Sequence, residues 1–447
     1  MSRRVLIIGG GFSGLSAGVR LAEAGFEVLL LERRQQLGGR AYSFIDSTTG
    51  DVVDNGQHLF MGCYRHTISF LERIGCLDKL KFQPTARVDF LDLEHRCSTF
   101  ECPALPAPLH ALVALFRMKG ISFPDKLRTL NVGLAIRKAR NGAGDRLTVS
   151  KWLDRLKQSA QIKERFWYPM MIATLNESPE IASARMMKVV LREAFGSGPA
   201  GTRIGIARVG LSELYTVGAR SFIEARGGEI RTGAEVKSIV EDGKSVSGVI
   251  MKEGETIEAD YLISSVPPAP LSQMLPSGLR EGDLAGVASL GSSPIVSINL
   301  WYDRPVLDRE FVGLLGTRSQ WAFNKDLIFG STRRSNHIAV VISAAHDHVD
   351  RTKQELIEIA VSDLERLIPE TRSARLLHST IVKEREATLS HTLEADLLRP
   401  PARTSIPNFF LAGDWIDTGL PATIESAVLS GADAAELIVK AADRQAP

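Results

Sequence analysis

Residues 5–14, VLIIGGGFSG, join four apolar residues to three consecutive glycines and place a fourth glycine at position 14. The apolar run predicts a buried β-strand, and the glycines predict a tight turn that leads into a helix. Gly9 makes the turn tight, Gly11 lets a phosphate approach the backbone, and Gly14 lets helix and strand pack closely. Backbone N–H groups and the helix N-terminus would then face a pyrophosphate, which predicts a dinucleotide-binding unit.

An acidic residue ends the next predicted strand. Residues 27–32, EVLLLE, close with Glu32, about twenty residues after the glycine turn. A carboxylate at this point can hold ribose hydroxyls and would repel a 2′-phosphate. Glu32 therefore favours FAD or NAD over NADP.

A second GxGxxG pattern occurs at residues 196–201, GSGPAG. No predicted strand precedes it, and Pro199 with the residues that follow gives no signal for the start of a helix. We expect a loop at this position, and only the N-terminal pattern is interpreted as a nucleotide site.

Three further segments favour a flavin over a nicotinamide. Two glycines precede an arginine in residues 37–40, LGGR, which suits a backbone that passes close to a pyrophosphate, although an ordinary surface turn is the alternative. Residues 408–414, NFFLAGD, predict a strand that ends at Asp414, whose carboxylate could accept hydrogen bonds from cofactor hydroxyls. Residues 419–427 predict the start of a helix with Pro421 in its first turn, and its N-terminus would face the isoalloxazine. Together these segments predict FAD.

Composition is typical of a globular enzyme with more than one domain. The chain has 447 residues, of which 44% are hydrophobic, and its formal net charge is +2. So balanced a charge gives no reason to expect nucleic acid as a partner. Four cysteines without a C-x-x-C pair fit a reducing compartment, and no apolar run reaches the ~20 residues of a membrane span. We expect a cytoplasmic protein.

The predicted elements give an α/β fold in which a Rossmann-like FAD-binding domain is interrupted by a mixed α+β substrate domain. We assign residues 1–81, 204–270 and 387–447 to the FAD-binding domain. Residues 82–203 form a helix-rich insertion, and residues 271–386 form an insertion of sheet and helix. The two insertions would build the substrate site.

Residues 105–118 predict an apolar helix, and a basic stretch follows it. Eight Lys or Arg and two Asp occur from Arg117 to Arg146. An apolar helix face could enter the lipid boundary while the cations meet anionic headgroups at the inner face of the cytoplasmic membrane. A core helix followed by a solvated basic helix is the alternative.

Two motifs carry a resemblance to a known family. Residues 54–58 read DNGQH, and residues 413–423 read GDWIDTGLPAT. Together with the glycine fingerprint and residues 37–40, they resemble the squalene-associated FAD enzymes, the hydroxysqualene dehydroxylases, over nearly the whole chain. The flavin elements are shared with phytoene desaturases and amine oxidases. The DNGQH and GDWIDTGLPAT segments are more specific.

The resemblance implies a reductive reaction in which hydroxysqualene loses its hydroxyl group and becomes squalene. An acid must protonate the allylic alcohol, and a hydride from reduced flavin must quench the cation that develops. The candidate proton donors are His58 and Asp417. Electrons would come from reduced nicotinamide or a partner reductase. The residues expected to bind FAD are Gly9, Gly11, Phe12, Ser13, Gly14, Glu32, Arg33, Gly39, Arg40, Gly56, Gln57, His58, Val236, Gly413, Asp414, Pro421, Ala422 and Thr423.

A long apolar isoprenoid would need a cavity wall of large apolar side chains. Candidates for this wall, which could equally be plain core, are Trp301, Trp321, Phe323, Met170, Met171, Met186 and Met187.

Three other functions fit the same sequence. A polyprenoid dehydrogenase like phytoene desaturase would run the redox chemistry in the opposite direction. An amine oxidase would need an aromatic cage and a lysine near the flavin, for which Lys325 is the candidate. A prenyl-lipid carrier of related architecture would need no flavin, although the glycines, Glu32 and Asp414 are all in place.

Overall fold

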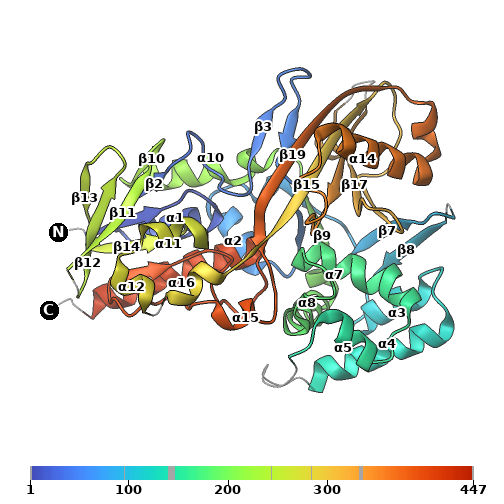
Figure 1. The fold of residues 1–447 in the computed structure, drawn as a ribbon, viewed down its shortest axis with the longest axis horizontal. Helices are drawn as coiled ribbons and strands as arrows, with labels where there is room; N and C mark the ends of the chain where they lie inside the picture. The colour runs from blue at the N-terminus through green and yellow to red at the C-terminus, as the bar shows by residue number, and fades with distance from the viewer. Residues whose placement is uncertain are drawn as a thin grey trace.

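A five-stranded parallel sheet forms one end of the molecule (Figure 1). The computed structural model describes residues 3–94, 96–138, 146–242, 244–282, 284–331 and 336–444. The strand that precedes the glycine turn is central and buried, as its apolar run predicts. The order is β10 (Glu229–Thr232), β2 (Glu27–Glu32), β1 (Arg4–Ile8), β14 (Tyr261–Ser264) and β20 (Phe409–Leu411), so strands from both ends and the middle of the chain meet here.

Both faces of this sheet are covered. Val5 and Ile7 of β1 share a hydrophobic cluster with residues of four helices, while Leu6 and Ile8 face a cluster built by short strands and helices. The first cluster contains residues of α1 (Phe12–Glu23), α2 (Arg65–Arg73), α10 (Leu211–Glu224) and α16 (Ile424–Asp443), and α2 packs beside α16. The second contains residues of β11 (Val236–Glu241), β12 (Val246–Met251), β13 (Thr256–Glu258), α11 (Pro268–Met274) and α12 (Ser277–Glu281).

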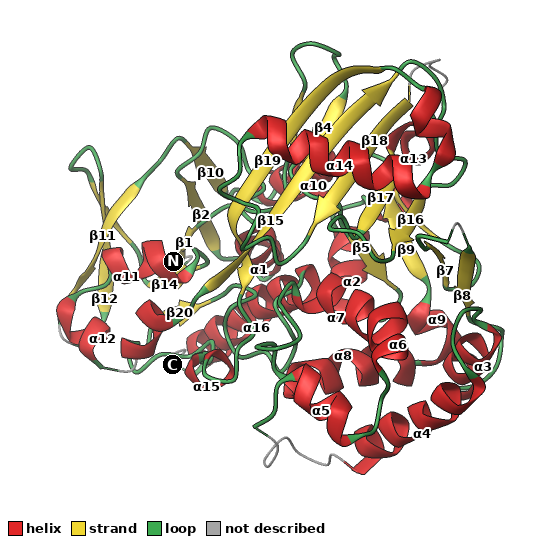
Figure 2. Cartoon of the chain, turned by 45° about the vertical axis from the view of Figure 1, so that its right-hand side comes forward, coloured by secondary structure: helices red, strands yellow, loops and turns green. Residues whose placement is uncertain are grey.

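A seven-stranded sheet forms the second large layer (Figure 2). Its order is β19 (Leu376–Leu389), β15 (Ser292–Tyr302), β18 (Asn336–Ile342), β17 (Trp321–Asn324), β16 (Phe311–Leu314), β7 (Arg87–Leu91) and β8 (Cys97–Glu101). Helix α14 (Lys353–Leu367) covers one face through a shared hydrophobic cluster. Strands β15 and β19 are long and lead from this sheet toward the parallel sheet.

Helices fill most of the segment between β8 and β9. They are α3 (Leu109–Arg117), α4 (Phe123–Lys138), α5 (Val149–Arg155), α6 (Ala160–Ile162), α7 (Tyr168–Leu175), α8 (Ala184–Gly196) and α9 (Gly198–Thr202). The segment 82–203 is thus helix-rich, but its strands β7 and β8 belong to the seven-stranded sheet. The domain boundaries drawn from the sequence stay a prediction.

Smaller elements connect these layers. A three-stranded sheet has the order β5 (Leu59–Met61), β9 (Ile204–Ala207) and β6 (Leu80–Phe82), and a hairpin-like pair consists of β3 (Ser43–Ile45) and β4 (Val52–Asp54). Two short helices, α13 (Lys325–Phe329) and α15 (Ala395–Leu398), lie in the connections of the substrate region and before β20. In the described part of the chain, no helix has both the length and the apolar character that a membrane crossing requires.

Two local predictions were wrong. Residues 196–201 are not a loop, because α8 extends to Gly196 and the short helix α9 begins at Gly198, with Pro199 in its first turn where no N–H is needed. The C-terminal helix begins at Ile424, with Thr423 as its N-cap, so Pro421 precedes the helix instead of entering its first turn.

Candidate functional site

The glycine turn between β1 and α1 forms a cradle that opens into a cavity. Gly9 has φ +106°, a conformation that side chains disfavour, and a Cβ on Gly14 would lie 2.0 Å from the Gly9 carbonyl oxygen. A Cβ on Gly11 would meet nothing nearer than the Gly39 Cα at 3.7 Å. Gly9 and Gly14 therefore shape the turn, whereas Gly11 leaves room for a ligand group beside the helix N-terminus.

The second glycine pair is held against this cradle. The Gly38 N–H donates to the Gly10 carbonyl at 2.9 Å, and the Tyr215 hydroxyl donates to the Gly38 carbonyl at 2.7 Å. The Tyr215 ring stacks on Phe12 with centroids 3.6 Å apart. Phe12, Ser13 and Gly39 line the cavity. The two glycine motifs thus form one continuous wall.

Glu32 closes the cradle at the end of β2. Its carboxylate is buried and accepts the N–H of Gly10 at 2.8 Å and that of Arg34 at 2.9 Å. Glu32, Arg33 and Val236 all line this end of the cavity. The carboxylate keeps further lone pairs, so it can both fix the turn and accept hydrogen bonds from ribose hydroxyls.

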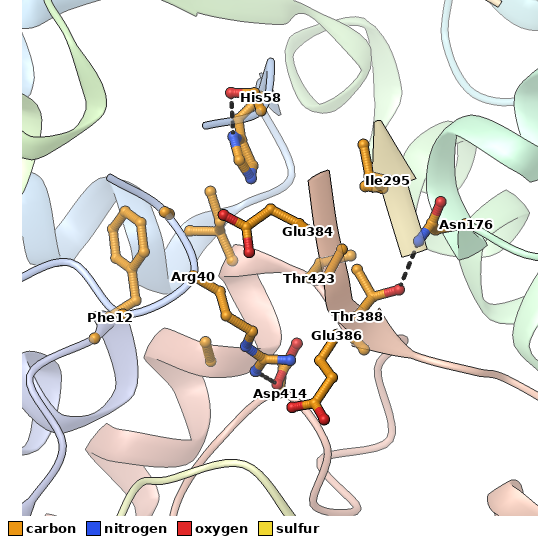
Figure 3. Close-up of a pocket in the computed structure, with 18 of the residues that line it drawn as sticks. Phe12, Arg40, His58, Asn176, Ile295, Glu384, Glu386, Thr388, Asp414 and Thr423 are labelled. Atoms are coloured by element: carbon orange, nitrogen blue, oxygen red, sulfur yellow. Dashed lines mark hydrogen bonds and ion pairs between the residues drawn. The ribbon is translucent and has the colours of Figure 1, made fainter. Parts of the chain in front are cut away.

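Arg40 and Asp414 meet on the cavity wall as an ion pair (Figure 3). Asp414 follows β20 and is buried, and Gly413 before it has φ +139° and donates its N–H to the Ser430 hydroxyl at 2.8 Å. The structure therefore brings the LGGR and AGD motifs together, as a shared ligand would require.

A polar cluster lies where β4 leads into β5. Lys325 Nζ is 2.8 Å from Asp54 Oδ2 and donates to Gln57 Oε1 at 2.9 Å. Burial alone would raise the pKa of the Asp54 carboxyl, but the charge and hydrogen bond of Lys325 hold it below its usual range. Gln57 Nε2 is buried and finds no hydrogen-bond partner among the described residues. Gly56, Gln57 and His58 line the cavity, so this amide can donate to a bound ligand.

His58 points into the cavity from this cluster (Figure 3). Its Nδ1 lies 3.1 Å from the Gly56 carbonyl, which favours the tautomer that carries hydrogen on Nδ1 and leaves Nε2 as an acceptor. Burial lowers the pKa of His58 below its ordinary value of 6.5. The neutral imidazole is therefore the resting form at neutral pH.

Sequence reasoning missed a carboxylate on the opposite wall. Glu384 comes from β19 and lies between His58 and Arg40 in Figure 3, with its Oε1 accepting the Asn55 side-chain amide at 3.0 Å. Residues 383–386 read KERE, a charged run that is typical of a solvent-exposed strand edge. The sequence contains no local signal that this strand would pass through a ligand cavity.

The start of α16 forms the cavity wall beyond Asp414. Ala422 and Thr423 line the cavity, and the Ala422 N–H donates to Nε2 of buried His391 at 2.7 Å. Pro421 is buried but does not line the cavity. Asp417, the second predicted proton donor, is exposed, does not line the cavity, and accepts the Gly419 N–H at 3.1 Å. Asp417 therefore caps a surface turn and is not placed to transfer a proton.

Buried Arg399 holds the Asp414–Leu420 loop. Its guanidinium donates to the carbonyls of Asp414, Trp415, Ile416 and Leu420. Nothing in the sequence motif indicated this support, because the arginine lies outside the GDWIDTGLPAT segment.

The other end of the cavity is apolar. The whole cavity, cofactor cradle included, has a volume of about 1180 Å³, more than the ~300–1,000 Å³ of common ligand pockets. Met170, Trp321 and Phe323 line it as expected, while Met171, Met186 and Met187 are buried core. Trp301 is also core, with its ring stacked on His337. Phe90, Phe100, Phe166 and Phe195 complete the apolar wall.

These features fit FAD. One continuous cavity contains three features that this cofactor requires. They are the close-packed glycine turn, the buried Glu32 carboxylate at the ribose position, and the buried Gln57 amide without a partner among the described residues. Gly14, Gly413 and Pro421 shape its walls without lining it, and the other expected cofactor residues do line it.

Comparison with known proteins agrees with this geometry. Hydroxysqualene dehydroxylase of Rhodopseudomonas palustris is 32% identical over 99% of this chain and 99% of that protein. The chloroplastic/chromoplastic 15-cis-phytoene desaturase of Arabidopsis thaliana is 26% identical over 98% of this chain and 80% of that protein. A crystal structure of an oxidoreductase from Methanosarcina mazei matches with a TM-score of 0.77 at 18% identity, covering 97% of this chain and 100% of that one.

The family of flavin containing amine oxidoreductases matches residues 12–439, which include all the cavity-lining segments from Phe12 onward. The chain belongs to this family and is an FAD-dependent oxidoreductase of its carotenoid and squalene desaturase branch.

Proposed function

We propose that this enzyme removes the hydroxyl group of hydroxysqualene reductively and yields squalene. The observation that carries the proposal is the single cavity, in which an FAD cradle and a polar cluster open into a large apolar end. A long hydrocarbon with one hydroxyl group matches this distribution of polarity. The 32% identical dehydroxylase supports the same substrate.

The reaction needs one proton and one hydride. The carbon–oxygen bond breaks as the hydroxyl oxygen takes up a proton and leaves as water, and the carbon receives the hydride. Bound FAD in its reduced form supplies hydride chemistry of this kind. The chain's own part is to hold the hydrocarbon, to exclude competing water with the aromatic wall, and to orient and protonate the hydroxyl group.

His58 and Glu384 are the two titratable groups proposed to handle the proton. His58 Nε2 faces the cavity as an acceptor while Nδ1 is held by Gly56, so the neutral ring can orient the hydroxyl group. Proton delivery by His58 requires its imidazolium, which burial disfavours. Glu384, fixed by Asn55, is the alternative donor on the facing strand.

The enzyme must be reduced before each turnover. The only other GxGxxG pattern forms the junction of α8 and α9 and follows no strand. We therefore propose that electrons come from free reduced nicotinamide or from a partner reductase. Because the substrate dissolves in lipid, peripheral contact with the inner face of the cytoplasmic membrane is part of the proposal.

A phytoene-desaturase-like dehydrogenation is the second candidate, favoured by the 26% identical relative and by the same apolar cavity. One experiment separates the two. Anaerobic dithionite-reduced enzyme is mixed with hydroxysqualene, and in parallel oxidised enzyme is mixed with phytoene. Squalene formation with reoxidation of the flavin supports the dehydroxylase. If phytoene reduces the oxidised flavin and no squalene forms with hydroxysqualene, the enzyme is a dehydrogenase and the dehydroxylase proposal is overturned.

A further inference from the structure

Helix α4 has its apolar side turned outward. Its residues Phe123, Leu127, Leu130 and Leu134 are 64%, 45%, 40% and 55% exposed. Their spacing of four, three and four places them along one helix face. The inward side carries Asp125 and Thr129, which are buried. A helix at the surface of a globular protein normally has the opposite arrangement.

The inward polar residues are satisfied within the protein, so the outward orientation is a stable feature of the fold. Asp125 accepts the Ser122 hydroxyl at 2.7 Å and pairs with Arg128 at 3.0 Å. The Thr129 hydroxyl donates to the Lys126 carbonyl at 2.6 Å. Val132, one turn further along, is buried in the cluster that contains the aromatic wall of the cavity. Turning the helix over would bury four apolar side chains but expose these bonds.

The apolar face continues onto α3. Phe116 contacts Phe123 edge-to-face with ring centroids 6.1 Å apart, and Leu109 is half exposed. The inner side of α3, Ala114 and Leu115, packs in the same cluster as the cavity-lining Phe100 and Phe166. Both helices lie at the outer edge of the helical region in Figures 1 and 2.

Exposed cations flank this face. Arg117, Lys119 and Arg137 are exposed. Arg128 is also exposed but pairs with Asp125, which is the only acidic residue between positions 102 and 144 of the sequence. Positions 139–145 of the predicted basic stretch lie outside the described residues. A second copy of the chain docking face to face through α4 would bring like charges together. An anionic lipid surface instead satisfies both the apolar stripe and the cations.

We propose that the outward face of α3 and α4 docks this enzyme on anionic membranes, with the leucines of α4 in the acyl boundary. The sequence predicts that the apolar helix over residues 105–118 enters the membrane. In the structure, more of the exposed large apolar side chains lie on α4 than on α3. This docking would hold the helical layer that packs behind the apolar wall of the cavity against the lipid. It deepens the proposed function, on which it rests, by naming the phase that supplies the substrate.

Flotation with vesicles tests the docking without any substrate, so its result is independent of the proposed reaction. Vesicles of equal parts phosphatidylglycerol and phosphatidylcholine are compared with pure phosphatidylcholine. We expect binding to the anionic vesicles that weakens with salt. The triple variant Leu127→Gln, Leu130→Gln, Leu134→Gln should lose about tenfold or more in partitioning. Arg117→Gln and Arg137→Gln should each lose about fivefold.

The matched control carries Ile45→Gln and Leu377→Gln, which replace apolar residues 63% and 50% exposed on β3 and β19. It should bind vesicles like the unaltered enzyme, and all variants should retain FAD and their unfolding temperature. Absence of binding to anionic vesicles, or equal binding by the triple variant, overturns the proposal. So does a dimer that dissociates in the triple variant while no form floats with lipid, because the face would then serve a second copy.

Discussion

Arg40 and Asp414 form an ion pair although 374 positions separate them in the sequence. One follows the β2 strand of the parallel sheet and the other follows β20 at its edge, so the pair ties the first and last parts of the FAD-binding region together. Both residues line the cavity. The pair therefore marks the place where the two sequence motifs act on one ligand.

Replacement of Asp414 by Ala should weaken FAD binding by about tenfold to a hundredfold, as expected for loss of a hydrogen bond involving a charged group. Asp417→Ala is the matched control, because this carboxylate lies three residues away but is exposed and outside the cavity. Titration of apoprotein with FAD, followed by quenching of flavin fluorescence, measures both affinities. Equal loss in the two variants would contradict the assignment.

Replacing Gly11 or Gly14 of the fingerprint should affect different properties of the protein. Gly11→Ala places its Cβ in ordinary van der Waals contact with the Gly39 Cα, at 3.7 Å, so the apoprotein should keep its free energy of unfolding within about 0.5 kcal/mol while FAD binding weakens. Gly14→Ala brings a methyl group against the Gly9 carbonyl and should destabilise the apoprotein by about 1–3 kcal/mol. Urea unfolding of both apoproteins, together with FAD titration, distinguishes these outcomes. A stable Gly14→Ala protein would show that the turn can relax.

Lys325→Met should destabilise the protein by about 3–5 kcal/mol, because it leaves the buried Asp54 carboxylate without its cation. The double variant Lys325→Met, Asp54→Asn should recover much of that loss. Lys79→Met is the control, since its pair with Glu213 is partly exposed and worth less than about 1 kcal/mol. Urea unfolding gives all three values, and a double variant no better than Lys325→Met would refute the coupling.

The pH dependence of the single-turnover rate should show whether His58 supplies the proton. Burial lowers the pKa of His58, so its imidazolium is scarce at neutral pH and becomes more abundant as pH falls below the ordinary value of 6.5. With His58 as donor, the reoxidation rate of reduced enzyme by hydroxysqualene should rise toward low pH, by at most about tenfold per unit. His58→Gln should abolish this rise, and Glu384→Gln should preserve it.

A rise toward low pH that persists unchanged in His58→Gln would remove His58 as donor and leave Glu384. Loss of turnover in Glu384→Gln with unchanged FAD affinity would then identify the carboxyl group as the proton source. Flavin absorbance followed by stopped flow records both profiles.

The sequence by itself determined the cofactor class and the parts that cradle it. Gly9, Gly14 and Glu32 act through backbone geometry and contacts within one β–α–β unit formed by β1, α1 and β2, so local pattern was enough to place them. The strand at residues 409–411 and the aspartate after it were predictable for the same reason.

Only the tertiary structure decided which other groups join the site. Glu384 reaches the cavity because a long strand of the second sheet passes it, and Asp417 misses it because its turn points to the surface. The outward leucines of α4 likewise follow from which face of the helix packs inward. Such contacts depend on sheet register and helix rotation, which are fixed by packing between segments hundreds of residues apart and leave no local trace in the sequence.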